Sequence, residues 1–238
     1  MLDYDGTLAP IVSDPARARL DREMLAVLKQ LAARDDLMVA VISGRALADL
    51  KRKVRLDSIY YAGCHGMEME GPGWSYVHPK MEMISVKICH LENYLRGILG
   101  RVRGSIIENK RYALTVHYRK VAARDRRKVE EVARQAEKSF SKWLKMEPGR
   151  MSFEYKPTVN WNKGKSVEIL LRLHRANNPY PIYIGDDLTD ESAFKRMLHK
   201  GLGILVNNNE RPYQTSAVIR IRSVRHVRQF LQYLAYTV

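Results

Sequence analysis

The sequence predicts an α/β protein, in which a doubly wound, Rossmann-like parallel sheet forms the core and a smaller α+β domain is inserted into it. In residues 1–62, short apolar runs typical of buried parallel strands alternate with amphipathic helical patterns. The same rhythm returns after residue 163. Between these regions, strand-like segments group together beside two long helical patterns, as they do in an α+β domain.

The first part of the chain alternates helices and strands. Residues 21–34 carry apolar side chains at helical spacing, and Asp21 stands where a side chain would cap the start of that helix. Residues 37–42 form a compact apolar run, which predicts a buried strand. We expect a second helix to begin after Arg45 and the next strand at residues 59–62. This order favours the doubly wound core.

The middle of the chain interrupts this order and the last part restores it. Residues 69–79 contain two glycines and a proline close together, which predicts a hairpin or a linker. The expected elements that follow are helices at 81–99 and 125–144, strands at 105–107, 113–118 and 151–155, helices after Gly164 and Thr189, strands at 180–184, 203–206 and 217–221, and a closing helix at 224–235. We therefore expect a discontinuous core (1–78 and 158–238) and an inserted domain (79–157).

Composition limits the class of protein. The 238 residues are enough to bury a substantial core. No apolar run reaches the length of a membrane span and the N-terminus does not resemble a signal peptide, so we expect no membrane association. Cys64 and Cys89 are too few for a disulfide framework and lack the spacing of a metal site. A reducing, cytoplasmic setting fits this cysteine usage.

The formal net charge of +15 has two interpretations, nucleic-acid binding or the handling of an anionic small molecule. The basic cluster at residues 124–128 lies in a helix-like stretch and is typical of a solvated face. No nucleic-acid-binding motif accompanies it. We therefore expect a small anionic partner and no nucleic acid.

The segment from Asp3 to Thr7 carries the strongest chemical signal. Alternate residues of an extended segment point to the same side, so Asp3 and Asp5 can face one pocket. Two such carboxylates hold their charge only with a cation or a proton between them, which indicates bound Mg²⁺. Gly6 lets the chain turn sharply beside a ligand. A calcium loop is disfavoured because it needs a third oxygen ligand before its glycine, whereas a solvated turn remains an alternative.

Three further signals follow predicted strands or begin predicted helices. Ser43 offers a hydroxyl to a phosphate oxygen, and Gly44 allows close backbone approach beside it. Lys163 begins a helix, where a cation and free N–H groups together suit an anion. The segment 185–190, with Asp186 and Asp187, supplies carboxylates for an oxygen-ligated Mg²⁺. Each signal alone also fits an ordinary turn or helix cap, but their order and placement together indicate one active site at a sheet edge.

Taken together, these motifs resemble those of the haloacid dehalogenase-like (HAD) phosphohydrolases, and the insert resembles their α/β cap domain. Within that superfamily the whole chain resembles the trehalose-6-phosphate phosphatases. The segments that carry this resemblance are 2–8, 42–45, 65–68, 116–119, 162–164 and 185–191. The resemblance implies a HAD-like fold, a cap that closes over the core, and a Mg²⁺-dependent phosphatase of trehalose biosynthesis.

The resemblance also implies a role for each motif residue. Asp3 would be the nucleophile that forms an aspartyl-phosphate, and Asp5 the general acid and base. Mg²⁺ would be held by Asp3, the backbone carbonyl of Asp5 and Asp186, with Asp187 orienting groups around the metal. The phosphoryl oxygens would be held by two catalytic residues, Ser43 and Lys163. The expected substrate-binding residues are Tyr4, Gly6, Gly44, Arg45, His65 and Glu68 in the core and Lys110, Arg119, Glu154 and Lys156 in the cap.

Two alternatives share these motifs. A phosphatase or mutase of another sugar phosphate would keep every catalytic residue and differ in the cap. A catalytically silent regulatory HAD domain would keep the fold alone, although the intact motif residues argue against it. We expect a sugar phosphate as the small-molecule partner, a trehalose-phosphate synthase as a partner or neighbouring domain, and a monomer.

Overall fold

The computed structural model describes residues 1–12, 14–149, 151–174, 179–207 and 214–237. The chain divides into two compact units. The first, the core unit, consists of Met1–Val77 and Trp161–Val238, and the second consists of His78–Asn160. The predicted α/β class, with a Rossmann-like core, is confirmed.

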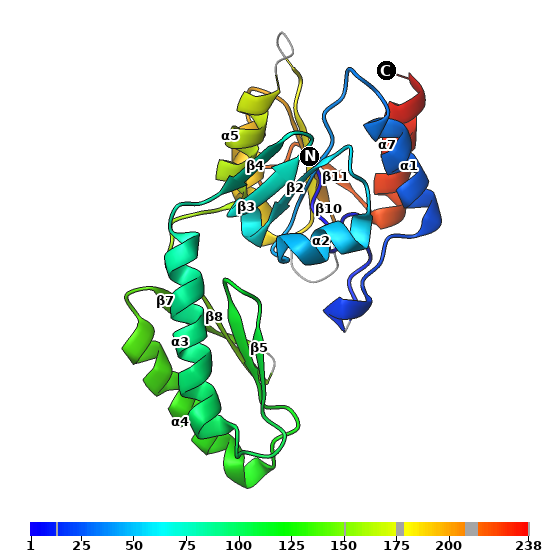
Figure 1. Cartoon of the computed structure of the whole chain (residues 1–238). Helices are drawn as coiled ribbons and strands as arrows, with labels where there is room; N and C mark the ends of the chain where they lie inside the picture. Colours follow the sequence, from blue (N-terminus) through cyan, green and yellow to red (C-terminus); the bar gives the residue numbers. More distant parts are fainter. Residues whose placement is uncertain (13, 150, 175–178, 208–213, 238) are drawn as a thin grey trace. The chain divides into compact units, whose positions relative to one another are not determined.

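A twisted sheet forms the centre of the core unit (Figure 1). On one side run β1 (Ala40–Ile42), β2 (Tyr60–Gly63), β3 (Glu68–Gly71) and β4 (Trp74–Val77), and on the other β9 (Ile182–Gly185), β10 (Leu202–Val206) and β11 (Ile219–Ile221). Leu2 joins the two sides through parallel bridges to Val41 and Ile184. The first residues of the chain therefore lie in mid-sheet, where their continuation, Asp3, reaches the carboxyl edge of the strands.

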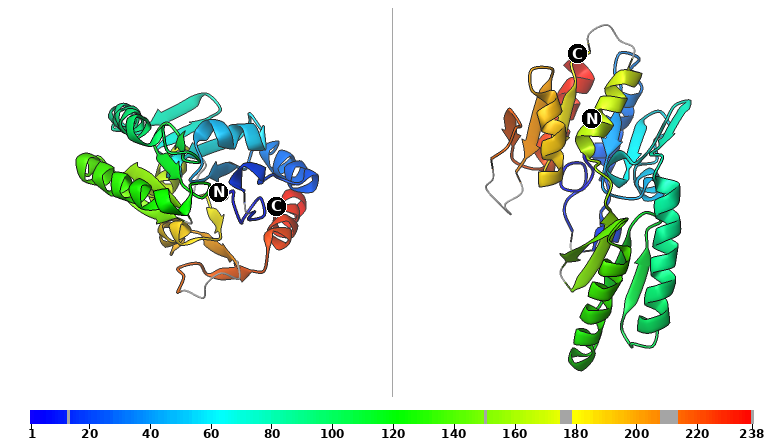
Figure 2. Two further views of the ribbon diagram at one scale, coloured as in Figure 1. Left: turned by 90° about the horizontal axis from the view of Figure 1, so that it is seen from below. Right: turned by 90° about the vertical axis from the view of Figure 1, so that its left-hand side faces the viewer.

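Helices cover both faces of this sheet. On one face lie α1 (Arg22–Ala32), α2 (Leu47–Val54) and α7 (Val224–Thr237), and on the other α5 (Lys163–Leu173) and α6 (Glu191–Met197). Figure 2 shows α1 and α7 side by side. Alternation along β1 separates the two layers, since Val41 packs with the first set whereas Ala40 and Ile42 pack with the second. Three short 3-10 turns complete the unit, at Pro15–Arg17, Cys64–Gly66 and Leu188–Asp190.

The second unit is an antiparallel sheet with two helices. Its strands are β5 (Ile106–Asn109), β6 (Leu114–His117), β7 (Leu144–Gly149) and β8 (Ser152–Pro157), in the order β5-β6-β8-β7. The helices are α3 (Met81–Leu99) and α4 (Ala123–Phe140). Tyr155 is buried on the helix side of β8 and its hydroxyl donates to the carbonyl of Ala133 in α4 at 2.8 Å. The helices thus cover one face of the sheet.

The helix α3 is the longest helix among the described residues, and it spans the segment that the sequence predicts. Its buried side chains recur every three or four residues, as expected of a helix that packs on a sheet with one face. They are Met81, Ile84, Ile88, Leu91, Leu95 and Leu99. In the described part of the chain no helix is both long and apolar enough to cross a membrane.

Several predicted elements differ from the structure in their extent; the strands expected at 180–184 and 217–221, for example, begin at Ile182 and Ile219. The helix expected at 125–144 ends at Phe140, and Leu144 begins the strand β7, which the sequence analysis did not predict. Leu144 continues the apolar spacing of α4, but its buried side chain belongs to a six-residue ladder with β8, and this tertiary pairing outweighs the local helical pattern. The strand expected at 37–42 is regular only at Ala40–Ile42.

Asp21 caps α1 as predicted, since its Oδ1 accepts a hydrogen bond from the backbone N–H of Met24 at 2.6 Å. Replacing it in D21A should lower the free energy of unfolding by about 1 kcal/mol, because the helix start loses its acceptor. D21N is the matched control, because an asparagine oxygen can still cap the helix. Urea unfolding of the full chain measures both, and equal losses in the two variants would contradict the capping role.

Glu147 on β7 pairs with Lys145 and with Lys156, and these hydrogen bonds lower the pKa of Glu147 from 4.5 to about 2. A carboxylate with a lowered pKa stabilises the fold above its ordinary pKa and loses this contribution as the pH falls toward the lowered value. E147Q should therefore lower the melting temperature at pH 7, and the gap to the unmodified protein should narrow below pH 4.5.

The matched control is E131Q, which breaks an exposed ion pair of Glu131 with Arg127 on α4. It should change the melting temperature little at any pH, because exposed pairs contribute little to stability. A gap between E147Q and the unmodified protein that stays constant from pH 7 to pH 3 would contradict the predicted linkage.

Candidate active site

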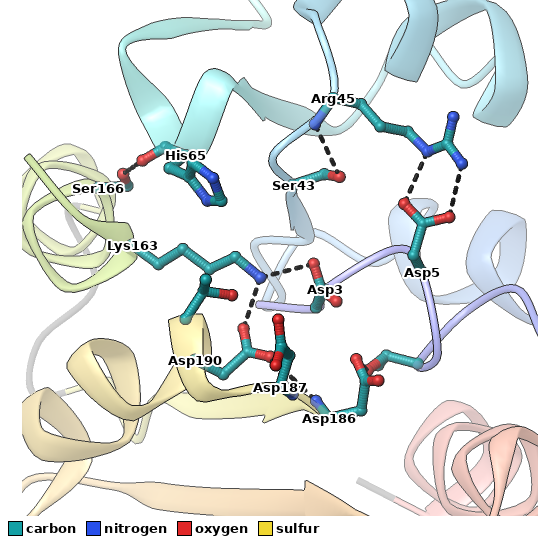
Figure 3. A network of polar contacts seen from close by, with 12 residues as sticks. Asp3, Asp5, Ser43, Arg45, His65, Lys163, Ser166, Asp186, Asp187 and Asp190 are labelled. Atoms are coloured by element: carbon teal, nitrogen blue, oxygen red, sulfur yellow. Dashed lines mark hydrogen bonds and ion pairs between the residues drawn. The ribbon is translucent and has the colours of Figure 1, made fainter. Parts of the chain in front are cut away.

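The predicted catalytic side chains meet at the carboxyl edge of the core sheet (Figure 3). Asp3 follows the bridge at Leu2, Ser43 follows β1 and Asp186 follows β9, so the sheet order brings them together. Lys163 is the first residue of α5, whose start is capped by Asn162. All four side chains are buried, Asp3 at 5% and Lys163 at 2% exposure. A buried polar cluster of this kind needs internal partners for each group.

Lys163 lies between two carboxylates. Its ammonium donates to Asp3 Oδ1 at 2.8 Å and to Asp190 Oδ1 at 2.6 Å. Burial by itself lowers the pKa of Lys163, but attraction by the two carboxylates outweighs burial, so the pKa rises and the side chain stays charged. Burial, with repulsion from Asp190 and Asp186, raises the pKa of Asp3 well above its ordinary value, against the attraction of Lys163. The lysine therefore only partly compensates the acidic groups around it.

Asp190 is a site residue that the sequence analysis missed. Its Oδ1 accepts from Lys163 and from the hydroxyl of Tyr183, the latter at 2.6 Å. Its Oδ2 accepts from the backbone N–H groups of Asp186 and Asp187 at 3.0 and 2.9 Å. The available signal was its place three residues after Asp187, since the two form a reciprocal capping box at the start of a helix. Capping alone explains such a residue, and its contact with Lys163 becomes visible only in the fold.

Three buried carboxylates could hold a metal ion. One oxygen from each of Asp3, Asp186 and Asp190 lies within 4.8 Å of the others. Oxygen donors with net negative charge suit Mg²⁺. Because both oxygens of Asp190 already accept hydrogen bonds, Asp3 and Asp186 are the carboxylates best able to face a cation. Asp187, also predicted at the metal, has an exposed side chain that caps the following 3-10 turn through Leu188 N–H.

Gly6 fits closely against Asp186. Its φ of +80° lies in the region that favours glycine, and a Cβ at this position would come within 2.0 Å of an Asp186 carboxylate oxygen. The neighbouring Thr7, fully buried, directs its hydroxyl at the same carboxylate at 3.4 Å. The sharp turn that we expected at Gly6 therefore brings the backbone against a carboxylate of the candidate metal site.

Asp5 and Arg45 form a bidentate ion pair beside this cluster (Figure 3). Arg45 Nε and Nη2 donate to the two oxygens of Asp5 at 2.7 and 2.6 Å. The side chain of Asp5 is 40% exposed, so it is the predicted catalytic carboxylate that water reaches most easily. Tyr4, predicted to bind substrate, is fully buried beneath Arg45, with Cζ of Arg45 5.3 Å from its ring centre. The side chain of Tyr4 is therefore closed to a ligand in this structure.

The loops after β1 and β2 are joined by backbone hydrogen bonds. His65 N–H donates to the carbonyl of Ser43 at 2.8 Å, and Cys64 N–H donates to that of Arg45 at 2.7 Å. Cys64 and His65 both have positive φ, a strained conformation for residues other than glycine. This conformation places the His65 ring against Gly44. A Cβ added at Gly44 would come within 2.8 Å of the imidazole. Gly44 thus makes room for His65, at the loop predicted to bind phosphate.

The other predicted substrate residues belong to β3 of the core unit and to the second unit. Glu68 is buried in β3, opposite Gly63. Lys110, Glu154 and Lys156 lie in the second unit, where Glu154 pairs with both lysines at 3.2 Å. The two lysines lower the pKa of the Glu154 carboxyl although burial opposes this. Arg119 lies in the exposed turn after β6.

Comparison with solved structures places the fold. A haloacid dehalogenase-like hydrolase from Bacteroides thetaiotaomicron superposes with a TM-score of 0.67 at 15% identity, over 98% of this chain and 97% of that one. A trehalose-6-phosphate phosphatase C-terminal domain from C. albicans superposes with a TM-score of 0.71 at 25% identity, over 100% of this chain and 91% of that one. These likenesses show that the chain has a HAD-like fold, with the carboxylates and the lysine at its sheet edge.

Sequence comparison narrows the class. The model of the trehalose-phosphatase family matches residues 1–223. A probable trehalose-phosphate phosphatase D from Arabidopsis thaliana is 36% identical over 98% of this chain, which spans 66% of that protein's length. The chain belongs to the trehalose-phosphatase family, and it covers about two thirds of the plant relatives that it matches.

The contact between Gly6 and Asp186 predicts the effect of a single methyl group. G6A should abolish most of any thermal stabilisation by added Mg²⁺, because the new Cβ displaces the Asp186 carboxylate. G73A is the matched control, since Gly73 also has a positive φ but has no atom within 4 Å of the added Cβ. It should cost about 1 kcal/mol of unfolding free energy and keep the Mg²⁺ response. A normal Mg²⁺ response in G6A would contradict the steric argument.

Proposed function

We propose that the chain is a Mg²⁺-dependent phosphatase that hydrolyses trehalose 6-phosphate to trehalose and phosphate through an aspartyl-phosphate on Asp3. The observation that carries this proposal is the buried contact of Lys163 with Asp3, beside Asp186, in a chain of the trehalose-phosphatase family. A nucleophilic carboxylate must approach a phosphate dianion, and both carry negative charge. A fixed cation beside the attacking oxygen reduces this repulsion, which supports Asp3 as the nucleophile.

Asp3 attacks phosphorus in line with the departing sugar oxygen, and the P–O bond to the sugar breaks as the bond to Asp3 forms. Asp5, in protonated form, gives its proton to the sugar oxygen. It then takes a proton from the water that attacks the aspartyl-phosphate, which releases phosphate and regenerates Asp3. The partial exposure of Asp5 supports this role, because both the sugar oxygen and the water must reach it.

The remaining residues bind charge. Bound Mg²⁺ would offset negative charge on the phosphoryl oxygens, and Asp3, Asp186 and the backbone carbonyl of Asp5 would hold it, with Asp187 orienting groups around it. Lys163 would hold a phosphoryl oxygen while Asp190 and Tyr183 keep its ammonium in place. The hydroxyl of Ser43 would hold another oxygen, aided by the backbone of Gly44.

We propose further that residues 79–157 serve as the cap domain of this enzyme. There Lys110, Glu154 and Lys156 form a half-buried charged cluster that suits sugar hydroxyl groups, because each side chain can exchange an internal partner for the ligand. Arg119 and, in the core, His65, Glu68 and Arg45 complete the proposed substrate contacts. A trehalose-phosphate synthase as partner or neighbouring domain, a monomeric state and a cytoplasmic location remain part of the proposal.

Phosphate release from a panel of sugar phosphates, with Mg²⁺ or with EDTA, tests the proposal. We expect the greatest release from trehalose 6-phosphate, loss of release with EDTA, and a loss of at least about 1,000-fold in D3N. D5N should lose about 100- to 10,000-fold, the usual contribution of general acid–base catalysis. Preference for another sugar phosphate would overturn the substrate, and full activity of D3N would overturn the mechanism.

A further inference from the structure

We propose that Asp49, a residue of α2 outside the catalytic motifs, is a positioning residue that aims the carboxyl group of Asp5 through the guanidinium of Arg45. The inference rests on the proposed function, in which Asp5 gives a proton to the departing sugar oxygen. It extends that function to a residue that never touches the substrate.

The first step is the dependence of Asp5 on Arg45. Asp5 stands on the segment between the buried Asp3 and the turn at Gly6, and its side chain is 40% exposed. A carboxyl group partly in water has little to fix its rotation. Arg45 supplies this restraint, because Nε and Nη2 bind both Asp5 oxygens and so fix the carboxyl plane relative to the guanidinium plane.

The second step is the way in which Arg45 itself is held. Its side chain is 11% exposed and lies over the ring of the buried Tyr4. Its backbone N–H donates to Ser43 Oγ at 3.2 Å, and its carbonyl accepts from Cys64. The remaining guanidinium nitrogen, Nη1, donates to Asp49 Oδ2 at 2.9 Å. The backbone and ring contacts fix where the arginine lies, and Asp49 fixes which edge of the guanidinium faces Asp5.

Asp49 selects the edge of the Arg45 guanidinium that binds Asp5. A guanidinium can bind a carboxylate through its Nε–Nη2 edge or through its Nη1–Nη2 edge. Asp49 occupies Nη1, so Asp5 is restricted to the Nε–Nη2 edge on which it lies. Without Asp49, the end-on edge becomes available and Asp5 can move with it. A displacement of a catalytic group by about 1 Å can cost about 100-fold in rate.

Because Asp49 acts on the proton donor alone, the effect of its replacement on kcat/KM should depend on the leaving group. A sugar alkoxide is a poor leaving group and needs the proton of Asp5, whereas p-nitrophenolate departs without one. The ratio kcat/KM reports the steps up to departure of the leaving group, so it isolates acid catalysis from the later attack of water. A purely structural role of Asp49 would lower kcat/KM for both substrates equally.

The experiment measures kcat/KM of the full chain with Mg²⁺ on trehalose 6-phosphate and on p-nitrophenyl phosphate. The kcat/KM of D49A should fall at least about 10-fold on the sugar phosphate and less than about 3-fold on the nitrophenyl ester. The kcat/KM of D49N on the sugar phosphate should lie between those of D49A and the unmodified protein, because the amide oxygen can still accept a hydrogen bond from Arg45. R52A is the matched control: it removes the other ion-pair partner of Asp49 and should leave both ratios unchanged.

D5N separates the two hypotheses. If D5N lowers kcat/KM equally for both substrates, the acid role of Asp5 in the proposed function is wrong and the inference is overturned with it. If D5N instead lowers kcat/KM selectively for the sugar phosphate, the proposed function stands. If D49A then lowers kcat/KM equally for both substrates, or for neither, the role of Asp49 alone is overturned.

Discussion

The structure depends on one buried ammonium group. Lys163 has lost nearly all contact with water, and its charge is compatible with the interior only because Asp3 and Asp190 lie within hydrogen-bond distance. These three residues come from the first residues of the chain, from the start of α5 and from the turn after β9. Their meeting requires the chain start to lie between β1 and β9, as the bridges of Leu2 place it. The burial of Lys163 between its two carboxylates therefore depends on the order of the strands in the sheet.

Asp190, the second carboxylate in contact with Lys163, connects the proposed active site with the local fold. Asp190 receives the ammonium on one oxygen and two backbone N–H groups on the other, so the same side chain places Lys163 and shapes the turn that presents Asp186. The hydroxyl of Tyr183 adds a donor from within the sheet, and burial with the charge of Asp190 raises the pKa of this phenol well above its usual range. The tyrosine therefore remains a donor, and the position of Lys163 is set by neutral and charged partners together.

Much of the fold and part of the site could be predicted from the sequence. The boundaries of α3 and the cap at Asp21 follow from apolar spacing and side-chain chemistry, which are local properties. The joint placement of Asp3, Ser43, Lys163 and Asp186 could be predicted because each follows a strand or begins a helix at the same sheet edge. The strand β7 could not, because Leu144 continues a helical pattern and only the ladder with β8 decides its structure.

The contacts that organise the site were beyond sequence reasoning for a related reason. Asp190 has the appearance of a helix cap and Tyr183 that of a core strand residue, and both descriptions are correct but incomplete. Gly6 has the appearance of a turn residue beside a ligand, yet the atoms nearest to its missing side chain belong to Asp186, near the other end of the chain. This fit joins two segments that lie far apart in the sequence. A chimera that takes its first segment from one protein and its last from another inherits a working centre only if that fit is inherited too.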